Sequence, residues 1–511
     1  QPARGVLFIG GNMGPTSSAL VDEFMLAVGG DRVDFDAVSD VPLKEAARIA
    51  YGVNEVPRYD IGAATLLLSF GNDFIETGTS PVAHSKGFSS MSAVDDAGGE
   101  KGRFVYLGPR LSLTGLNADE WIPIQSGSEA AVALGMASAI AGQGAAGPYG
   151  NLLQAYDPAS AAAAAGVSVE AIEGLAERFA SEESSLAMGP GAGAHHRNTT
   201  AANLAVMILN HVAGNVGTTV FYEGVSSAAT TSYSDIESVI NAMASGDIGV
   251  VMVHGTNPAY SLPAASGFVE AFEQVPYKVS FASAMDETSD LCDLVLPDSH
   301  FFESWGDSTP RAGALAIQQP VMQQVSTFDS KPSGDAMLAV LRHLGNEPEA
   351  ATFYDYLRAR HEAAYDGSSG DFETYWHQTL RVGTTELGAV DEGAAQLRAP
   401  DTALSFDTPL LDGSDDGLTL LVHPSGRFGG GEFSNSPWMQ ELPDPVSKIT
   451  WHSWLEINPH TAEERGIRNG DIVSVTSSHG SLEVPVWLYP GIREDTVALA
   501  MGGGHTAMGR Y

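Results

Sequence analysis

Short apolar runs that end in glycine recur through more than half of the chain, with helical spacing between them. Three such runs open it, Val6–Ile9, Ala64–Phe70 and Phe104–Leu107, and each is four to seven residues long. A run of this length without polar alternation is typical of a strand buried on both faces, and strands that alternate with helices pair in parallel. The pattern therefore predicts an α/β fold in which helices cover both faces of a parallel sheet.

A low-complexity passage at 142–150 (GQGAAGPYG) interrupts this pattern and predicts a domain boundary. Four further strands are expected beyond it, at Ser185–Met188, Ile248–Val253, Lys278–Phe281 and Leu294–Leu296. Helical segments separate them, which predicts a second doubly wound domain of the Rossmann-like type.

The pattern changes to short β-runs from Leu418 onward, and turns such as 466–471 (GIRNGD) and 490–492 (PGI) separate them. Short strands at such close spacing predict a small barrel. We therefore expect two doubly wound Rossmann-like domains followed by a small six-stranded, double-psi-like β-barrel. The expected boundaries are 1–148 for the first α/β domain, 149–347 for the second, 348–408 for a helical and loop connector, and 409–511 for the barrel.

Acidic residues outnumber basic ones by 63 to 25, which gives a formal net charge of −38. A free-standing nucleic-acid binder needs the opposite sign to neutralise phosphates, and an anionic membrane surface repels such a chain. The acidity is spread along the chain. Two interpretations stay open: a salt-adapted surface whose self-repulsion is screened by salt, or an acidic docking face for a basic partner such as a cytochrome.

Cys292 is the only cysteine in the chain. One thiol rules out an intrachain disulfide, an iron–sulfur cluster held by four thiolates and a cysteine-based structural zinc site. The acidic surroundings of Cys292 do not favour a thiolate, so we expect a structural role for it. No apolar run approaches the roughly 20 residues that a membrane-spanning helix needs, so no direct membrane span is expected.

Two glycine-containing turns follow expected strands in the second α/β segment. Gly189-Pro190-Gly191-Ala192-Gly193 has the form of a dinucleotide-binding loop, but it lacks an acidic partner about 20 positions further on. We expect His195-His196 beside it to be ordinary loop histidines. His254-Gly255-Thr256-Asn257-Pro258 closes a buried strand, where α/β folds bind ligands, although an ordinary strand-end turn also explains it.

Longer strings are more specific. They are 286–307, which includes Asp286-Glu287-Thr288, then 435–445, and 456–480 with its Gly-Ile-Arg-Asn-Gly-Asp turn. Together with the Gly-Thr-Asn-Pro turn, they resemble the molybdopterin-guanine-dinucleotide oxidoreductases over nearly the whole chain, beginning after that family's usual N-terminal cluster domain. The strings 74–82, 305–307 and 437–445 resemble more narrowly the molybdopterin-like part of the large iron–sulfur subunit of alternative complex III, a membrane quinol:electron-acceptor oxidoreductase.

The resemblance implies which positions face the cofactor in family members. The matching positions are Gly255, Asn257 and Pro258 at one nucleotide end, Asp286 and Glu303 nearby, and Arg427, Asn435 and His505 in the barrel. The alternative is that these residues keep interdomain packing without a ligand. For Asp286 and Glu303 we favour that alternative, because carboxylates are good hydrogen-bond acceptors.

Family members that hold molybdenum supply one protein ligand, a cysteine, selenocysteine, serine or aspartate, shortly before the strand at 64–71. Here 35–44 reads FDAVSDVPLK, so Ser39 and Asp40 are the candidates, with Asp40 as a hard oxygen donor. The competing interpretation makes both of them turn residues, with Asp40 capping a helix at 43–50. We expect no cofactor in this chain, and molybdenum bis-molybdopterin guanine dinucleotide is the alternative.

The leading hypothesis is a non-catalytic scaffold in a membrane-associated quinol-oxidising complex on the periplasmic side of the inner membrane. By resemblance, its partners are an iron–sulfur (ferredoxin-like) part, cytochrome c subunits and quinol-oxidising membrane subunits. Gly509-Arg510-Tyr511 stops inside a family string, so we expect the polypeptide to continue. Two other hypotheses stay open: an active molybdenum oxidoreductase of a small oxo substrate with Asp40 or Ser39 as ligand, and an independent dehydrogenase that uses the 189–193 loop.

Overall fold

The computed structural model divides the chain into two compact units, and each unit is discontinuous along the sequence. Unit 1 consists of 1–37, 227–390 and 504–511, and unit 2 of 38–226 and 391–503. The structure describes residues 5–94, 101–141, 147–191, 196–222, 231–311, 313–346, 348–367, 370–386, 395–409, 417–507 and 509. The four segments expected from the sequence as domains are each contiguous, and their boundaries stay predictions.

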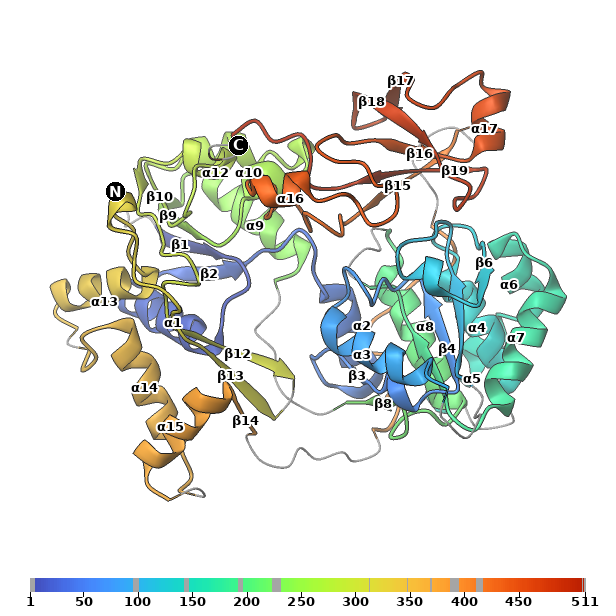
Figure 1. Ribbon diagram of the computed structural model, residues 1–511, viewed down its shortest axis with the longest axis horizontal. Coiled ribbons are helices and arrows are strands. Elements are labelled where there is room, and N and C mark those ends of the chain that lie inside the picture. The colour runs from blue at the N-terminus through green and yellow to red at the C-terminus, as the bar shows by residue number, and fades with distance from the viewer. Residues whose placement is uncertain are drawn as a thin grey trace. The chain divides into compact units, whose positions relative to one another are not determined.

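Unit 1 contains a parallel sheet of five strands (Figure 1). The strands lie in the order β11 (Leu294–Val295), β10 (Tyr277–Ser280), β9 (Ile248–His254), β1 (Gly5–Gly10) and β2 (Asp31–Asp34). Adjacent strands run parallel throughout. The β1–β9 neighbourhood is the point at which successive connections leave for opposite edges of the sheet, and α/β folds bind ligands at such a point.

Alternate residues of β1 enter two different hydrophobic cores, one on each face of the sheet. Phe8 packs with residues of α1 (Pro15–Val28) and α13 (Ser333–His343). Leu7 and Ile9 pack instead with residues of α9 (Tyr233–Ala244) and α11 (Phe268–Glu273). Because side chains alternate across a strand, a run that is apolar at every position is explained by burial on both faces.

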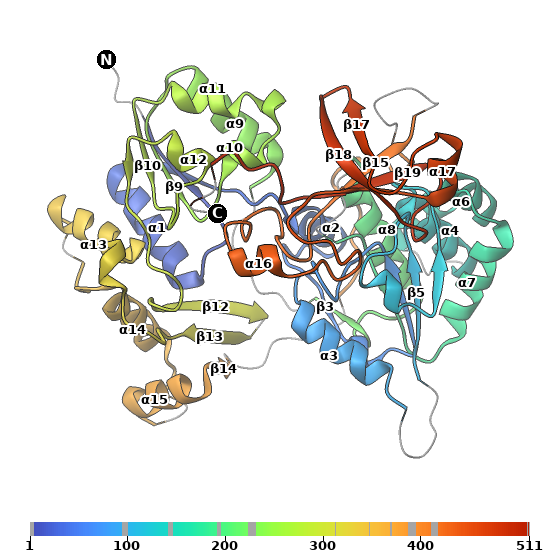
Figure 2. The same ribbon diagram turned by 45° about the horizontal axis from the view of Figure 1, so that its top comes forward.

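A smaller sheet and two helices extend unit 1. The hairpin of β12 (Gly306–Arg311) and β13 (Ala314–Gln318) is antiparallel, and β14 (Thr384–Glu386) pairs with β13 (Figure 2). The helices α14 (Phe353–Ala364) and α15 (Phe372–Val382) lie beside it. Residues of both helices join the core that contains Phe8, so this extension shares one core with the parallel sheet.

Unit 2 contains a second parallel sheet, of four strands. Its order is β6 (Glu120–Ile122), β5 (Arg103–Leu107), β4 (Leu66–Phe70) and β7 (Ser185–Met188). The strands Val6–Ile9 and Ala64–Phe70, which we expected in one sheet, thus lie in different units. Strand pairing is decided by contacts between distant segments, whereas the local pattern reports only that each run is buried.

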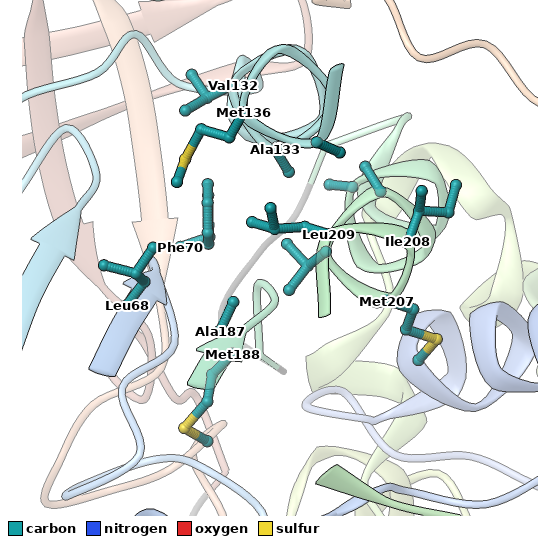
Figure 3. Close-up of a cluster of buried hydrophobic side chains, with 14 of the residues drawn as sticks. Leu68, Phe70, Val132, Ala133, Met136, Ala187, Met188, Met207, Ile208 and Leu209 are labelled. Atoms are coloured by element: carbon teal, nitrogen blue, oxygen red, sulfur yellow. The ribbon is translucent and has the colours of Figure 1, made fainter. Parts of the chain in front are cut away.

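Helices α2 (Val41–Tyr51), α4 (Glu129–Ile140) and α8 (Thr199–Val212) supply much of the core of unit 2. Figure 3 shows side chains of α4 and α8 facing those of β4 and β7. The other helices and strands of 38–226 are β3 (Arg58–Tyr59), α3 (Pro81–Met91), α5 (Gly150–Leu153), α6 (Pro158–Ala165), α7 (Val169–Ser181) and β8 (Val220–Phe221).

The C-terminal part of unit 2 is a mixed sheet that curls into half a barrel (Figure 2). Its order is β15 (Thr419–His423), β19 (Thr496–Ala500), β16 (Leu455–Ile457), β18 (Gly480–Leu488) and β17 (Ile472–Ser477). The five strands lie in the region from Leu418 onward, where the sequence predicts short β-runs. Among the described residues the sheet has five strands and open edges at β15 and β17, where we expected a closed six-stranded barrel.

The described residues contain no single helix that is long and apolar enough to cross a membrane. Only α6 and α7 taken together pass that test, as a pair bent by 118°.

Candidate functional site

The candidate site of unit 1 begins at the carboxyl ends of β1 and β9. Gly255 has φ +67°, a left-handed conformation that favours glycine. A Cβ atom on Gly11 would overlap the carbonyl oxygen of Gly255, and the Gly11 amide donates to the His254 carbonyl at 2.8 Å. The two strand-end turns therefore touch through their backbones, which explains the glycine at each of them.

Both ends of the Asn257 side-chain amide are engaged inside unit 1. Asn257 lies directly before α10 (Pro258–Ser261), and its Nδ2 donates to Glu287 Oε2 at 2.8 Å. Its Oδ1 accepts from the Thr288 backbone N–H at 3.1 Å and from Thr288 Oγ1 at 2.7 Å. The amide thus ties the Gly-Thr-Asn-Pro turn to α12 (Glu287–Asp290). Pro258 is buried as the first residue of α10, where the missing N–H costs nothing.

Glu287 is the carboxylate that connects this site, and our reading of the sequence singled out its neighbour Asp286 instead. Besides the Asn257 amide, Glu287 accepts from the Thr506 N–H at 2.7 Å and from the Ala507 N–H at 3.2 Å. Burial alone would raise its pKa, but the hydrogen bonds from Asn257 and these backbone groups outweigh burial and hold the pKa at about 2. Glu287 therefore fixes the segment at 504–507 as an ionised acceptor.

His505 packs in the same cluster. Its ring stacks on Tyr260 with 3.6 Å between ring centroids and 15° between ring planes. Its Nδ1 lies 3.1 Å from Glu287 Oε1, while its Nε2 is buried and has no hydrogen-bond partner among the described residues. The structure thus brings together Gly255, Asn257, Pro258 and His505, four of the positions expected from the sequence.

The other two acidic candidates of unit 1 hold their own loops. Asp286 is the N-cap of α12 and accepts from the Ser289 N–H at 2.7 Å, and burial raises its pKa. Glu303 accepts from the His300 N–H at 3.2 Å and from the Val325 N–H at 2.9 Å. All of these contacts lie within unit 1, so they show local loop packing, and the interdomain packing that we favoured for both residues stays a prediction.

Arg427 and Asn435 belong to unit 2, on the loop between β15 and α16 (Pro437–Glu441). Arg427 is 3% exposed, donates from Nη1 to the Leu442 carbonyl at 2.8 Å and lies over the Phe428 ring at 4.5 Å. Its Nε is buried and has no hydrogen-bond partner in the described part of the chain. This guanidinium thus supports the loop around α16.

The candidate metal ligands lie at the start of α2. Asp40 stands at the N-cap position of that helix but its side chain makes no capping hydrogen bond there, and Ser39 precedes it. Throughout the described ranges, no group of three or more histidine, cysteine, aspartate or glutamate side chains is arranged to hold a metal ion.

The 189–193 loop is described only as far as Gly191. The carbonyl of Gly189 accepts from Asn72 Nδ2 at 2.9 Å, and a Cβ on Gly191 would lie 3.3 Å from the same amide nitrogen. Residues 192–195, with Gly193 and His195, lie outside the described residues. His196 Nε2 is 3.4 Å from Glu129 Oε2 on α4, so the two side chains form an ion pair when the histidine is protonated.

A buried ion pair in unit 2 escaped the sequence reasoning. Arg110 and Glu456 are 8% and 1% exposed, and the guanidinium makes two hydrogen bonds to the carboxylate, one of them from Nη2 to Oε1 at 2.9 Å. The two residues are 346 positions apart in the chain. No local pattern in the sequence indicates such a pair, because its two members meet only when distant segments fold together.

Two carboxyl groups lie on the same side of unit 2 as Arg110, directly after β4. Asp73 accepts from Ser112 Oγ at 2.5 Å and from the Tyr106 hydroxyl at 3.0 Å. Burial, and then the charge of Asp73, raise the pKa of Glu76 to about 8, and Arg110 only partly opposes this rise. The result is a buried carboxyl group that can hold a proton at neutral pH.

Comparison with known proteins shows which protein family the chain matches. The chain matches the families described as Molybdopterin oxidoreductase, over residues 6–331, and Molydopterin dinucleotide binding domain, over residues 438–510. It is similar to the menaquinone reductase molybdopterin-binding-like subunit of Nitratidesulfovibrio vulgaris, with 29% identity over 489 residues, 89% of this chain and 67% of that protein.

Two further similarities extend over most of the chain. The arsenate respiratory reductase molybdopterin-containing subunit of Shewanella sp. is 22% identical over 617 residues, 90% of this chain and 71% of that protein. Acetylene hydratase from Pelobacter acetylenicus superposes with a TM-score of 0.76 at 14% identity, over 97% of this chain and 79% of that one. At this identity, the structural likeness shows a shared fold.

Proposed function

Because the chain belongs to the molybdopterin oxidoreductase family, we propose that it is the molybdopterin-binding-like subunit of a membrane-associated quinone or quinol oxidoreductase complex. The observation that best supports this proposal is the similarity to the menaquinone reductase subunit over 89% of the chain. Family membership confirms the resemblance that the Gly-Thr-Asn-Pro turn and the 286–307 string indicated. The narrower likeness to alternative complex III is part of this proposal.

We further propose that this subunit works without the cofactor of its family. A dinucleotide of this kind needs donors and acceptors for its guanine, phosphates and pterin, and buried polar groups that are already paired are costly to release. Asn257, one of the matching positions, has both amide ends engaged, and its partner Glu287 also accepts from two backbone N–H groups. The residues present therefore do not fit the group.

Among the described residues at the matching positions, two buried nitrogens have no hydrogen-bond partner, His505 Nε2 and Arg427 Nε, one in each unit. Two nitrogens are too few for a bis-dinucleotide, which presents many polar atoms. The segment 35–44 offers no thiolate for molybdenum, and its Asp40 stands at the N-cap of α2. These observations support a scaffold through which no electrons pass.

The proposed partners are an iron–sulfur (ferredoxin-like) part, cytochrome c subunits and the quinol-oxidising membrane subunits, on the periplasmic side of the membrane. An excess of 38 negative charges suits contact with basic partners, because opposite charges speed encounter and fix orientation. In this arrangement the chain holds electron carriers in place and contributes no group to the reaction.

Metal and pterin analysis tests the cofactor-free function. The chain is produced in a host that makes molybdenum cofactor, and a catalytically active family member is produced beside it as the control. We expect molybdenum or tungsten, together with pterin fluorescence, in the control, and background levels of both the metal and the pterin in this chain. Molybdenum or tungsten at one atom per chain would instead support the active oxidoreductase, and replacing Asp40 or Ser39 by alanine would then remove the metal.

Association with a complex is a separate test of the same proposal. The chain is tagged in its own organism, and the membrane fraction is purified through the tag under mild detergent. We expect haem and iron–sulfur absorbance to co-purify with quinol oxidation activity. If the tagged chain is recovered alone and the quinol oxidation activity stays in the fraction that does not bind through the tag, the proposal is contradicted.

A further inference from the structure

Besides the 189–193 loop of unit 2, the chain contains a dinucleotide-type turn in unit 1 that the sequence analysis did not single out. Strand β1 ends in Gly10-Gly11, Gly14 follows as the N-cap of α1, and β2 ends in Asp34 beside β1. Gly11 and Gly14 match the last two glycines of the G-x-G-x-x-G fingerprint of dinucleotide-binding units, whereas Ile9 stands at the position of the first. The strand, the turn, the helix and the acidic residue at the end of the next strand resemble such a unit in the other respects. In such units a phosphate lies at the helix N-terminus, where free N–H groups and the helix dipole attract an anion.

A carboxylate of the protein lies at that position. Asp307, on β12, accepts from the Thr16 backbone N–H at 3.0 Å through Oδ1 and from Thr16 Oγ1 at 2.5 Å through Oδ2. His361, on α14, places Nε2 3.5 Å from Asp307 Oδ2. Burial would raise the pKa of Asp307, but the contacts with His361 and Thr16 outweigh burial and lower it. An ionised oxygen pair thus occupies the first turn of α1.

The backbone of β12 also closes the turn. A Cβ on Gly14 would overlap the Asp307 carbonyl oxygen, so the strand runs directly against the glycine that a phosphate would approach. The acidic residue of the unit is engaged as well: Asp34 accepts from Arg32 Nε at 2.9 Å and from Arg32 Nη2 at 3.0 Å. The phosphate position of the turn is thus filled, and the acidic residue of the unit is already ion-paired with Arg32.

A second carboxylate of the same segment repeats the arrangement at another helix. Asp298 accepts from the Ser333 N–H at 2.8 Å and from Ser333 Oγ at 2.9 Å, at the start of α13, and its Oδ2 lies 2.9 Å from His254 Nε2. Pro332, not a glycine turn, precedes α13. Asp298 therefore makes the same contacts at a helix that has no phosphate-binding turn, and it is a matched control.

We propose that Asp307 takes the place of a bound phosphate at the β1–α1 turn, so that unit 1 keeps a dinucleotide-binding turn that is closed to anions. The inference deepens the cofactor-free function proposed above and rests on it, because a chain without a nucleotide can use this turn to hold β12 and α14 against the sheet. Thr16, Asp307 and His361 are then positioning residues.

Anion binding by Asp307→Ala tests the proposal, with inorganic pyrophosphate as the probe. Removing the carboxylate frees the N–H and hydroxyl groups of Thr16 and leaves His361 beside the vacated space. We expect Asp307→Ala to melt below the wild type and pyrophosphate to raise its melting temperature while leaving the wild type unchanged. Calorimetry should show pyrophosphate binding to Asp307→Ala about tenfold or more tightly than to the wild type.

Two further variants make the result specific. Asp298→Ala should lose stability as well but gain no pyrophosphate binding, because its helix lacks the glycine turn. Thr16→Val in the Asp307→Ala background should remove the gained binding, because the hydroxyl donor is lost. Equal binding of pyrophosphate to wild type and Asp307→Ala, or equal gains in Asp307→Ala and Asp298→Ala, would overturn the proposal.

The test also gives a result if the Asp307→Ala variant does not fold. If Asp307→Ala stays unfolded in plain buffer, recovery of the fold with pyrophosphate supports the proposal. Failure to fold in both buffers, together with an Asp307→Asn variant that melts at the wild-type temperature, would overturn it. The metal and pterin analysis decides the proposed function separately, since pyrophosphate binding by the wild-type chain contradicts a closed turn whether or not pterin is present.

Discussion

At the scale of single residues, the candidate site is held by hydrogen bonds to one carboxylate. Glu287 joins Asn257 after β9 to the backbone of Thr506 and Ala507 near the chain end. Hydrogen bonds to a charged acceptor contribute more than neutral ones, and a donor left unpaired by removal of the acceptor adds a further cost. The side chain therefore connects three segments that lie far apart in the sequence.

Replacing Glu287 by glutamine should destabilise unit 1 at neutral pH by about 1 to 2 kcal/mol, after allowance for solvent screening. The folded pKa of about 2 lies below the usual 4.5, so the stabilisation is present above about pH 4.5 and is lost as the pH falls toward 2. Urea unfolding of wild type and Glu287→Gln at several pH values measures this. Equal stability losses in both proteins on acidification would contradict the assignment.

The ionisation of Glu76 should make the stability depend on pH in the opposite direction, because the folded pKa of Glu76, about 8, is higher than the usual 4.5. The folded chain binds a proton that the unfolded chain has lost, so this contribution to stability falls as the pH rises from about 4.5 to 8, by at most about 1.4 kcal/mol per pH unit. Glu76→Gln should flatten that decline. Urea unfolding between these pH values measures it, and a decline as steep in Glu76→Gln as in wild type would rule out Glu76 as its source.

Cys292 is expected to react with thiol reagents only when the protein opens. Burial, and then the charge of Asp286, raise its pKa to about 12, and its Sγ donates to the Thr288 carbonyl at 3.3 Å. The reactive thiolate is therefore scarce at neutral pH. Labelling should be slow in buffer and fast in urea, as followed by mass spectrometry. Rapid labelling of the folded chain would contradict the structural role that the sequence indicates.

At the scale of elements, the contact between two strand-end turns decides which residues the site can contain. Gly11 after β1 and Gly255 after β9 approach so closely that a side chain on Gly11 has no room. The parallel pairing of β1 with β9 produces this contact, because it places both carboxyl ends at one edge of the sheet. Glycine is thus required here by close approach, and Gly255 also by its positive φ.

Gly11→Ala should destabilise the protein by roughly 1 to 3 kcal/mol, because the added methyl group overlaps backbone that cannot move aside easily. Gly174→Ala is the matched control: that glycine lies inside α7, a Cβ atom on it would meet no described atom within 4 Å, and alanine favours a helix by about 1 kcal/mol. Chemical unfolding of both variants compares the two. Equal effects in both would show that the close approach carries no cost.

At the scale of the whole molecule, charge dominates. With 63 acidic residues against 25 basic ones, self-repulsion lowers stability when salt is dilute, and molar salt shortens the screening length to about 3 Å. A surface adapted to salt gains stability from this screening. An acidic docking face gains less in isolation, and its attraction to a basic partner weakens as salt rises.

The melting temperature should therefore be higher in molar potassium chloride than in dilute buffer. Differential scanning calorimetry at both ionic strengths measures the shift, and chloride is preferable to sulfate because sulfate also strengthens apolar burial. The same melting temperature in both buffers would leave partner docking as the better explanation of the acidity.

The local sequence pattern predicted many of the strands correctly. The expected runs at Ser185–Met188 and Ile248–Val253 are strands β7 and β9, and Phe104–Leu107 lies within β5. Such runs are readable from sequence because periodicity and terminal glycines are properties of a few neighbouring residues. Family-like strings such as 286–307 likewise indicated the family that the comparison shows.

Tertiary structure alone decided which strands share a sheet and which carboxylates matter. Asp286 and Glu287 are adjacent and equally acidic, yet only Glu287 meets Asn257 and the segment at 504–507, because α12 directs the two side chains differently. Asp307 reaches Thr16 across 291 positions of chain. A sequence fixes local propensity by itself, whereas the partner of a polar side chain depends on contacts that form only when distant segments fold together.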